Sequence, residues 1–128
     1  MAHRSRLYTI SIDVPPDVHD RELAFWERAV GREMPPIAAF PDFHRTTLPG
    51  QDVMFITQRL QEGAPAVHVD IHTDDLEAEV ARLEAAGAVR DRFTESGWWI
   101  MRDPAGLRFC VLEDPPGTLN AENSTLWE

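Results

Sequence analysis

The sequence repeats itself once, and this repeat restricts the folds open to the chain more than any other feature. Alternating apolar and polar residues, then a helical segment and short strands, occur in the first half and again in the second. The matching pairs, 54 to 57 residues apart, are Asp13 with Asp70, Gly31 with Gly87, and Phe55 with Phe109. Repetition at a nearly constant spacing indicates that one supersecondary unit is used twice.

Two segments, residues 8–14 and 67–71, have the alternation of a half-buried strand. Their apolar residues are Ile10, Ile12 and Val14, and Val67, Val69 and Ile71. Their polar residues are Thr9, Ser11 and Asp13, and His68, Asp70 and His72. Because strand side chains alternate between the two faces, we expect the apolar sets to pack on helices. The polar sets should line a cavity holding water, a ligand or a hydrogen-bond network, since unpaired burial is costly. The alternative is a solvated sheet surface.

Each strand is followed by a predicted helix. The first spans residues 18–30, with Asp17 as its cap, Gly31 as its end and Trp26 in the core. The second follows Asp74, a capping residue, and ends near Gly87. Further strands are predicted at residues 37–40, 43–48 and 52–60, and at residues 89–93, 97–102 and 107–113.

Composition limits the kinds of partner. The chain has 128 residues, a formal charge of −10, one cysteine and no lysine among its 12 basic residues. An acidic chain without a basic cluster is a poor candidate for nucleic acid or anionic membranes. We therefore expect one soluble, cytoplasmic domain over residues 1–114, with repeat units at about residues 6–60 and 66–113. Residues 115–128 form an acidic C-terminal tail, mobile unless Leu126 and Trp127 dock on the body or on a partner.

Three stretches carry a family resemblance. They are LAFWERAVG from Leu23, VHVDIHTDDLEAEVARLEAAGA from Val67 and WWIMRDPAGLRFCVLE from Trp98. In this order they resemble the vicinal oxygen chelate superfamily, the glyoxalase, bleomycin-resistance and dioxygenase group, and most closely its glyoxalase-like subgroup. The resemblance implies an α+β fold. In it, two tandem βαβββ units form a curved mixed sheet around a cavity, with the helices outside and a homodimer as the assembly.

The same resemblance bears on metal binding. Metal-containing relatives take a histidine from the first strand of each unit and a carboxylate from the last strand. His68 matches the second histidine, whereas the first falls on Ser11, or on Thr9 if an insertion is placed differently. The carboxylate positions fall on Cys110 and near Ile56. Because transition metals need at least three good protein ligands, we expect no metal cofactor.

The candidate site residues fall into two groups. His68, Asp70 and Asp13 are the predicted catalytic residues, since histidine titrates near neutrality and carboxylates complete acid–base pairs. A structural role for His68 remains the alternative. Residues predicted to contact a ligand are Ser11, His44, Phe55, Trp99, Met101 and Cys110. His3, His19 and His72 are interpreted as surface or loop residues.

Three functions are compatible with these residues. The first is binding of a small organic molecule, aromatic or carbonyl-containing, without a metal, as in bleomycin-resistance proteins. The second is a lyase, isomerase or dioxygenase-type enzyme that uses His68 with a cavity carboxylate or a non-standard metal site. The third is a structural module whose cavity is filled by its own side chains. Whether the protein is an enzyme is left open by the sequence.

Overall fold

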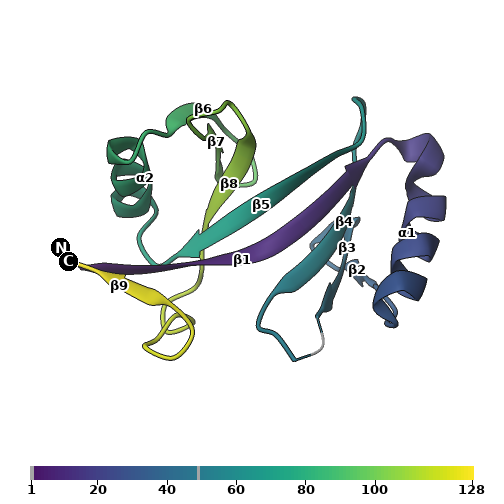
Figure 1. The fold of residues 1–128 in the computed structure, drawn as a ribbon, viewed down its shortest axis with the longest axis horizontal. Helices are drawn as coiled ribbons and strands as arrows, with labels where there is room; N and C mark the ends of the chain where they lie inside the picture. Colours follow the sequence, from purple (N-terminus) through teal and green to yellow (C-terminus); the bar gives the residue numbers. More distant parts are fainter. Residues whose placement is uncertain (1, 49) are drawn as a thin grey trace. The chain divides into compact units, whose positions relative to one another are not determined.

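The computed structural model describes residues 2–48 and 50–128, which form nine strands and two helices (Figure 1). The first half contains β1 (His3–Val14), α1 (Pro16–Val30), β2 (Pro36–Ile37), β3 (Phe40–Thr47) and β4 (Met54–Arg59). The second contains β5 (Ala66–Thr73), α2 (Leu76–Ala85), β6 (Val89–Phe93), β7 (Trp99–Arg102) and β8 (Arg108–Glu113), followed by β9 (Thr125–Trp127). Parallel and antiparallel pairings both occur, so the predicted α+β class with two βαβββ repeats is confirmed. No helix of the described residues is long and apolar enough to cross a membrane.

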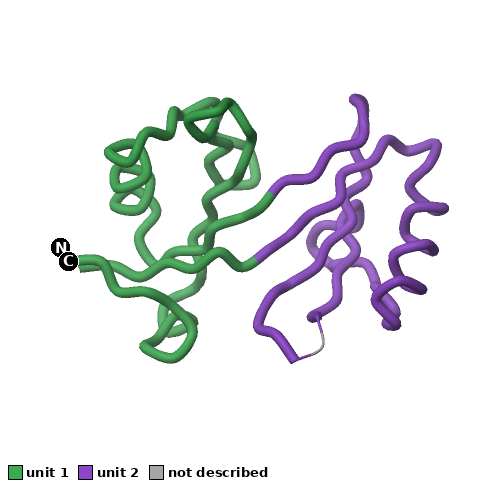
Figure 2. Tube along the Cα trace, in the orientation of Figure 1, with its two compact units in different colours: residues 1–8, 69–128 green, residues 9–68 purple. Residues whose placement is uncertain are grey.

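The chain divides into two compact units (Figure 2). Unit 2 is the continuous segment of residues 9–68. Unit 1 combines residues 69–128 with the beginning of the chain up to Tyr8. The strands β1 and β5 each pass from one unit into the other, so each unit is described separately below.

In unit 2 the strands are ordered β2-β3-β4-β1, with β1 parallel to β4 and β3 antiparallel to β4. Helix α1 begins two residues earlier than predicted, because Pro16 occupies its first turn, where proline is favoured. The prediction that Asp17 caps this helix is wrong: the N-cap is Pro15, which makes no side-chain hydrogen bond. Gly31 ends the helix in the left-handed conformation, as predicted. Trp26, expected in the core, is only half-buried.

In unit 1 the strands are ordered β5-β8-β7-β6, with β5 parallel to β8 and the other pairs antiparallel. The core consists of Val80, Met101, Phe109 and Val111, with Val69, Ile71 and Trp99 among the residues packed against it. Helix α2 begins one residue later than predicted. Its N-cap is Asp75, whose side chain accepts a hydrogen bond from the Ala78 amide, whereas Asp74 accepts one from the Arg4 amide.

The C-terminal residues dock on unit 1. Strand β9 pairs antiparallel with the first residues of β1, with His3 opposite Trp127. The indole of Trp127 donates a hydrogen bond of 2.9 Å to Ser5, and the Arg82 guanidinium lies 3.8 Å above its ring. Of the two alternatives for this tail, docking on the body is therefore the one observed.

Candidate functional site

A histidine and two short polar side chains come together on the polar face of β1 in unit 2. The Nδ1 atom of His68 lies 2.5 Å from Oδ2 of Asp13. The hydroxyl of Ser11 donates to the other carboxylate oxygen, Oδ1, at 2.8 Å. Because an ionised carboxylate only accepts hydrogen bonds, Nδ1 carries the proton in this contact. The carboxylate therefore fixes the tautomer and the orientation of the ring, as is typical of histidines that act in acid–base chemistry.

The alternation of β1 explains this arrangement. Ser11 and Asp13 are two residues apart, so their side chains lie on the same face of the strand. Thr9 is on this face too, and the exposed fractions of Thr9, Ser11 and Asp13 are 0, 2 and 3%. The alternative of a solvated sheet surface is therefore wrong.

Thr9 has a further property that the sequence could not show. Within residues 2–48 and 50–128 its buried hydroxyl has no hydrogen-bond partner. Buried polar atoms are normally paired, so an orphaned hydroxyl beside the Ser11–Asp13 pair marks a place for a water or ligand oxygen. Sequence reasoning placed Thr9 on the polar face of the strand and considered it as an alternative metal position.

Asp70 and Cys110 belong to unit 1, where they are direct register partners on β5 and β8. Both side chains are buried. Their chain neighbours Val69, Ile71 and Phe109 pack in the core beneath α2. Because side chains alternate along each strand, Asp70 and Cys110 lie on the opposite face of this sheet.

These residues bear on the metal that the family resemblance implies. The strand β5 carries His68 and, two residues later, Asp70, whose register partner is Cys110. Imidazole, carboxylate and thiol are all ligand types for divalent transition metals. A carboxylate on the second ring nitrogen, as Asp13 provides, is also typical of metal-ligating histidines. The donor set fits a divalent ion, and the expectation of a metal-free protein stays a prediction.

Two predicted ligand residues of unit 2 lie on the helix side of the sheet instead. Phe55 is buried, and its ring lies 5.3 Å from that of Trp26 on α1. The ring of His44 lies 5.0 Å from that of His19, also on α1. Register explains this placement, since Phe55 pairs with Ile10 and not with Ser11. The structure does not bring Phe55 or His44 to the His68–Asp13 contact.

In unit 1, Trp99 and Met101 are placed in the same way. Met101 is fully buried in the core, and Trp99 packs against that core. Cys110 pairs with Ile100, which lies on the other face of β7. Because side chains alternate along a strand, the face that Trp99 occupies depends on the register, and the register makes Trp99 a core residue.

Three histidines interpreted as surface residues are buried. His72 donates through Nδ1 to Asp114 at 2.8 Å, His19 contacts the Thr57 hydroxyl at 3.3 Å, and His3 lies 2.7 Å from Glu79. For His72 a signal was present, because it continues the polar alternation of His68 and Asp70. The alternation placed it with these residues, but it was interpreted as a surface or loop residue because the predicted strand ended at Ile71, whereas β5 extends to Thr73.

One titratable group in each unit, Glu79 in unit 1 and His44 in unit 2, has a lowered pKa, and the causes differ. Burial alone would raise the pKa of Glu79, but hydrogen bonds from Arg82, His3 and Ser5 outweigh it and lower the pKa. Burial lowers the pKa of His44, and the neighbouring His19 lowers it further. The lowered pKa values therefore favour the ionised form of Glu79 and the neutral form of His44.

Comparisons with known proteins agree with this architecture. A family model described as a glyoxalase-like domain matches residues 9–112. No curated protein matches the sequence. The chain is similar to a solved structure titled NAD-dependent benzaldehyde dehydrogenase from Legionella pneumophila. The two proteins are 8% identical in sequence. Their superposition covers 84% of this chain and 98% of the other, with a TM-score of 0.63.

Two further structures have the same fold. Methylmalonyl-CoA epimerase from Mycobacterium tuberculosis has 16% identity and a TM-score of 0.56, over 86% of this chain and 88% of the epimerase. A variant of 4-hydroxymandelate synthase from Streptomyces coelicolor has 14% identity and a TM-score of 0.56, over 92% of this chain and 51% of the synthase. At these identities the likeness concerns the fold alone. Because the family model spans most of the sequence and the fold agrees, the chain belongs to the glyoxalase-like domain family of the vicinal oxygen chelate superfamily.

Proposed function

We propose that this protein is an enzyme that transfers a proton on a small carbonyl-containing molecule, with His68 as the general acid and base. The observation that carries the proposal is the His68–Asp13 contact, in which a buried carboxylate holds one ring nitrogen of the histidine. A general acid–base group of this kind typically contributes about 10²- to 10⁴-fold to a rate. Simple ligand binding would not need a histidine that is oriented by a buried carboxylate.

Each of the neighbouring side chains has a role in this mechanism. Asp13 accepts a hydrogen bond from Nδ1 and stabilises the imidazolium that forms when Nε2 takes a proton from the substrate. Ser11 holds Asp13 in place by donating to its other oxygen. The unpartnered hydroxyl of Thr9 donates a hydrogen bond to a substrate oxygen. Asp13 and Ser11 are thus positioning residues, whereas His68 is the catalytic residue.

A second use of His68 is as a metal ligand, and the observation favouring it is the Asp13 carboxylate on its Nδ1, which is typical of metal-ligating histidines. A bound divalent ion would supply Lewis-acid activation of a carbonyl oxygen. Metal analysis distinguishes the two uses. Under the acid–base proposal, the metal content of the purified protein is the same for wild type and His68→Gln.

The first substrates to screen are small carbonyl acids and thioesters with an exchangeable proton beside the carbonyl group, since an epimerase of methylmalonyl-CoA has this fold. Proton NMR in D₂O would follow exchange at that carbon. We expect His68→Gln to lower the exchange rate by about 10²-fold or more without unfolding the protein. The matched control is His72→Gln, which removes the other carboxylate-bound histidine of β5 and should leave the rate unchanged. A folded His68→Gln variant with the wild-type rate would overturn the proposal.

A further inference from the structure

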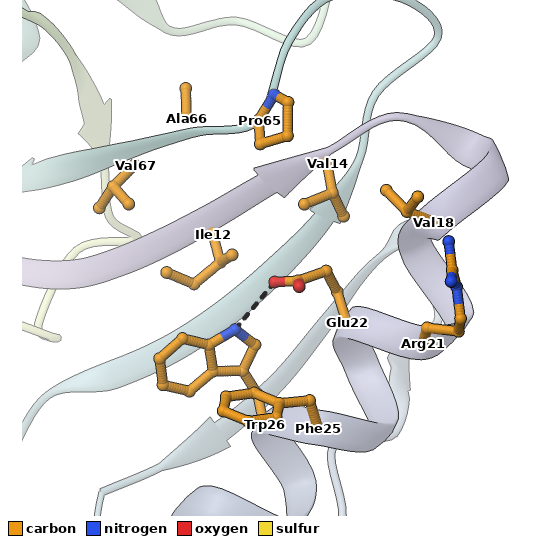
Figure 3. Close-up of a pocket in the computed structure, with 10 residues that line it drawn as sticks. All are labelled: Ile12, Val14, Val18, Arg21, Glu22, Phe25, Trp26, Pro65, Ala66 and Val67. Atoms are coloured by element: carbon orange, nitrogen blue, oxygen red, sulfur yellow. Dashed lines mark hydrogen bonds between the residues drawn. The ribbon is translucent and has the colours of Figure 1, made fainter.

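A groove runs along unit 2 between α1 and the adjoining strands (Figure 3). Its volume is about 670 Å³, within the range of roughly 300–1,000 Å³ that is typical of small-molecule sites. Ile12 and Val14 form part of its lining, and they alternate along β1 with Ser11 and Asp13. The groove is therefore on the opposite face of β1 from the His68–Asp13 contact.

Most side chains that line the groove are apolar or aromatic, and some of them are exposed to solvent. Phe25 and Val67 line it and are 59 and 63% exposed. Trp26 lines it too and stacks edge to face with Phe25, the ring centroids being 5.1 Å apart. These side chains offer an apolar surface to a ligand of matching shape.

One carboxylate projects into this apolar lining. Figure 3 shows Glu22 directed from α1 toward Ile12 and Trp26. Its Oε2 atom accepts a hydrogen bond of 3.0 Å from the indole nitrogen of Trp26. Within the described part of the chain this carboxylate has no ion-pair partner, and Arg21, which also lines the groove, extends along the outer side of the helix. The groove thus combines a negative charge with the faces of aromatic rings.

We propose that this groove is a second ligand site, which binds a small organic cation with an apolar body, such as an aryl-alkyl amine. The ammonium group would pair with Glu22 and lie near the indole of Trp26, since aromatic faces attract cations. The apolar body would cover Ile12, Phe25 and Val67 and remove them from water. A net charge of −10 favours the approach of a cation.

The probe for this site is 2-phenylethylamine, with 3-phenylpropionate as the anion of similar shape. Titration of ¹⁵N-labelled protein should shift the indole N–H resonance of Trp26 with the amine, and the carboxylate should bind at least about tenfold more weakly. Glu22→Gln keeps an acceptor for Trp26 but removes the charge, and it should weaken amine binding about tenfold. Phe25→Ala should weaken it too, whereas Phe93→Ala, an equally exposed phenylalanine of unit 1, should not.

His68→Gln should leave amine binding unchanged, so failure of this site is distinguishable from failure of the acid–base proposal. Equal binding of amine and carboxylate, or no response to Glu22→Gln and Phe25→Ala in folded variants, would overturn the inference. So would a wild-type dimer, seen by sedimentation, that Phe25→Ala converts to a monomer. In that case a second copy of the chain covers the groove.

Discussion

Two buried histidine–carboxylate contacts, one in each unit, have different surroundings. In unit 1, Glu79 is fully buried and bound by His3, and the guanidinium of Arg82 contacts both of its oxygens at 2.8 Å. In unit 2, Asp13 is bound by His68 and by the neutral hydroxyl of Ser11. A cation on both oxygens neutralises Glu79 permanently, whereas the charge of Asp13 is balanced only when the imidazole is protonated. The comparison indicates that the first contact stabilises the fold and that the second is suited to proton exchange.

The largest effect on stability should come from the contact in unit 1. Glu79→Gln removes the charge that pairs with Arg82 and His3, and a hydrogen bond to a charged group contributes about 1.5–3 kcal/mol. Thermal and urea denaturation would measure the loss. The matched control is Glu84→Gln on the same helix, whose exposed side chain contacts Arg90 at 3.1 Å and should contribute less than about 1 kcal/mol. Equal losses for the two variants would remove the distinction between the units.

Asp13→Asn should reduce turnover more than stability, the opposite of what is expected for Glu79→Gln. It removes the charge that stabilises the imidazolium of His68 but keeps the volume of the side chain. We expect turnover of an identified substrate to fall by about 10²-fold, with a smaller loss of unfolding free energy than for Glu79→Gln. Kinetics and denaturation on the same sample provide the comparison. If stability fell as much as in Glu79→Gln and turnover did not change, Asp13 would be structural.

The next effect concerns strand β9, whose Trp127 lies over Arg82, the partner of Glu79 in unit 1. Trp127→Ala removes the stacking on Arg82 and the hydrogen bond to Ser5, which together should cost about 1–2 kcal/mol. Amide hydrogen exchange should become faster in the first residues of β1, where β9 pairs. Leu126→Ala, at an exposed neighbouring position, serves as the control and should leave that exchange rate near wild type. Unchanged exchange in Trp127→Ala would mean that the indole does not hold β9.

The smallest effect is a difference between His44→Gln and wild type in how the melting temperature depends on pH. The pKa of His44 is lowered from 6.5, so its neutral form stabilises unit 2 above pH 6.5, and this contribution is lost as the pH falls below that value. The pKa of Glu79 is lowered from 4.5, so its contribution persists to pH 4.5 and is lost only at lower pH. Melting temperatures between pH 7.5 and 5 should therefore decrease less in His44→Gln than in wild type. Parallel curves would contradict the lowered pKa of His44.

Much of the fold could be predicted because local patterns determine it. The repeat, the alternation of residues 8–14 and the glycine that ends α1 each act over a few residues. The faces occupied by Phe55, Trp99 and Met101 could not be predicted, since one residue of register reverses them. The partners of the buried histidines also lie far away in sequence: Asp13 is 55 residues from His68, and Glu79 is 76 residues from His3. Such pairs depend on how the strands meet, which no short pattern encodes.

The division of β1 between the units has a consequence for synthesis. The residues of unit 2 are contiguous, so they leave the ribosome together and can begin to pack while the rest is being translated. Unit 1 needs His3 and Ser5 from the beginning of the chain and Trp127 from near its end. Its first strand must therefore wait until Trp127, 122 residues after Ser5, has been synthesised and its partner β9 emerges. A ribosome stalled before Trp127 would hold a chain whose unit 2 is complete while this edge of β1 is still unpaired.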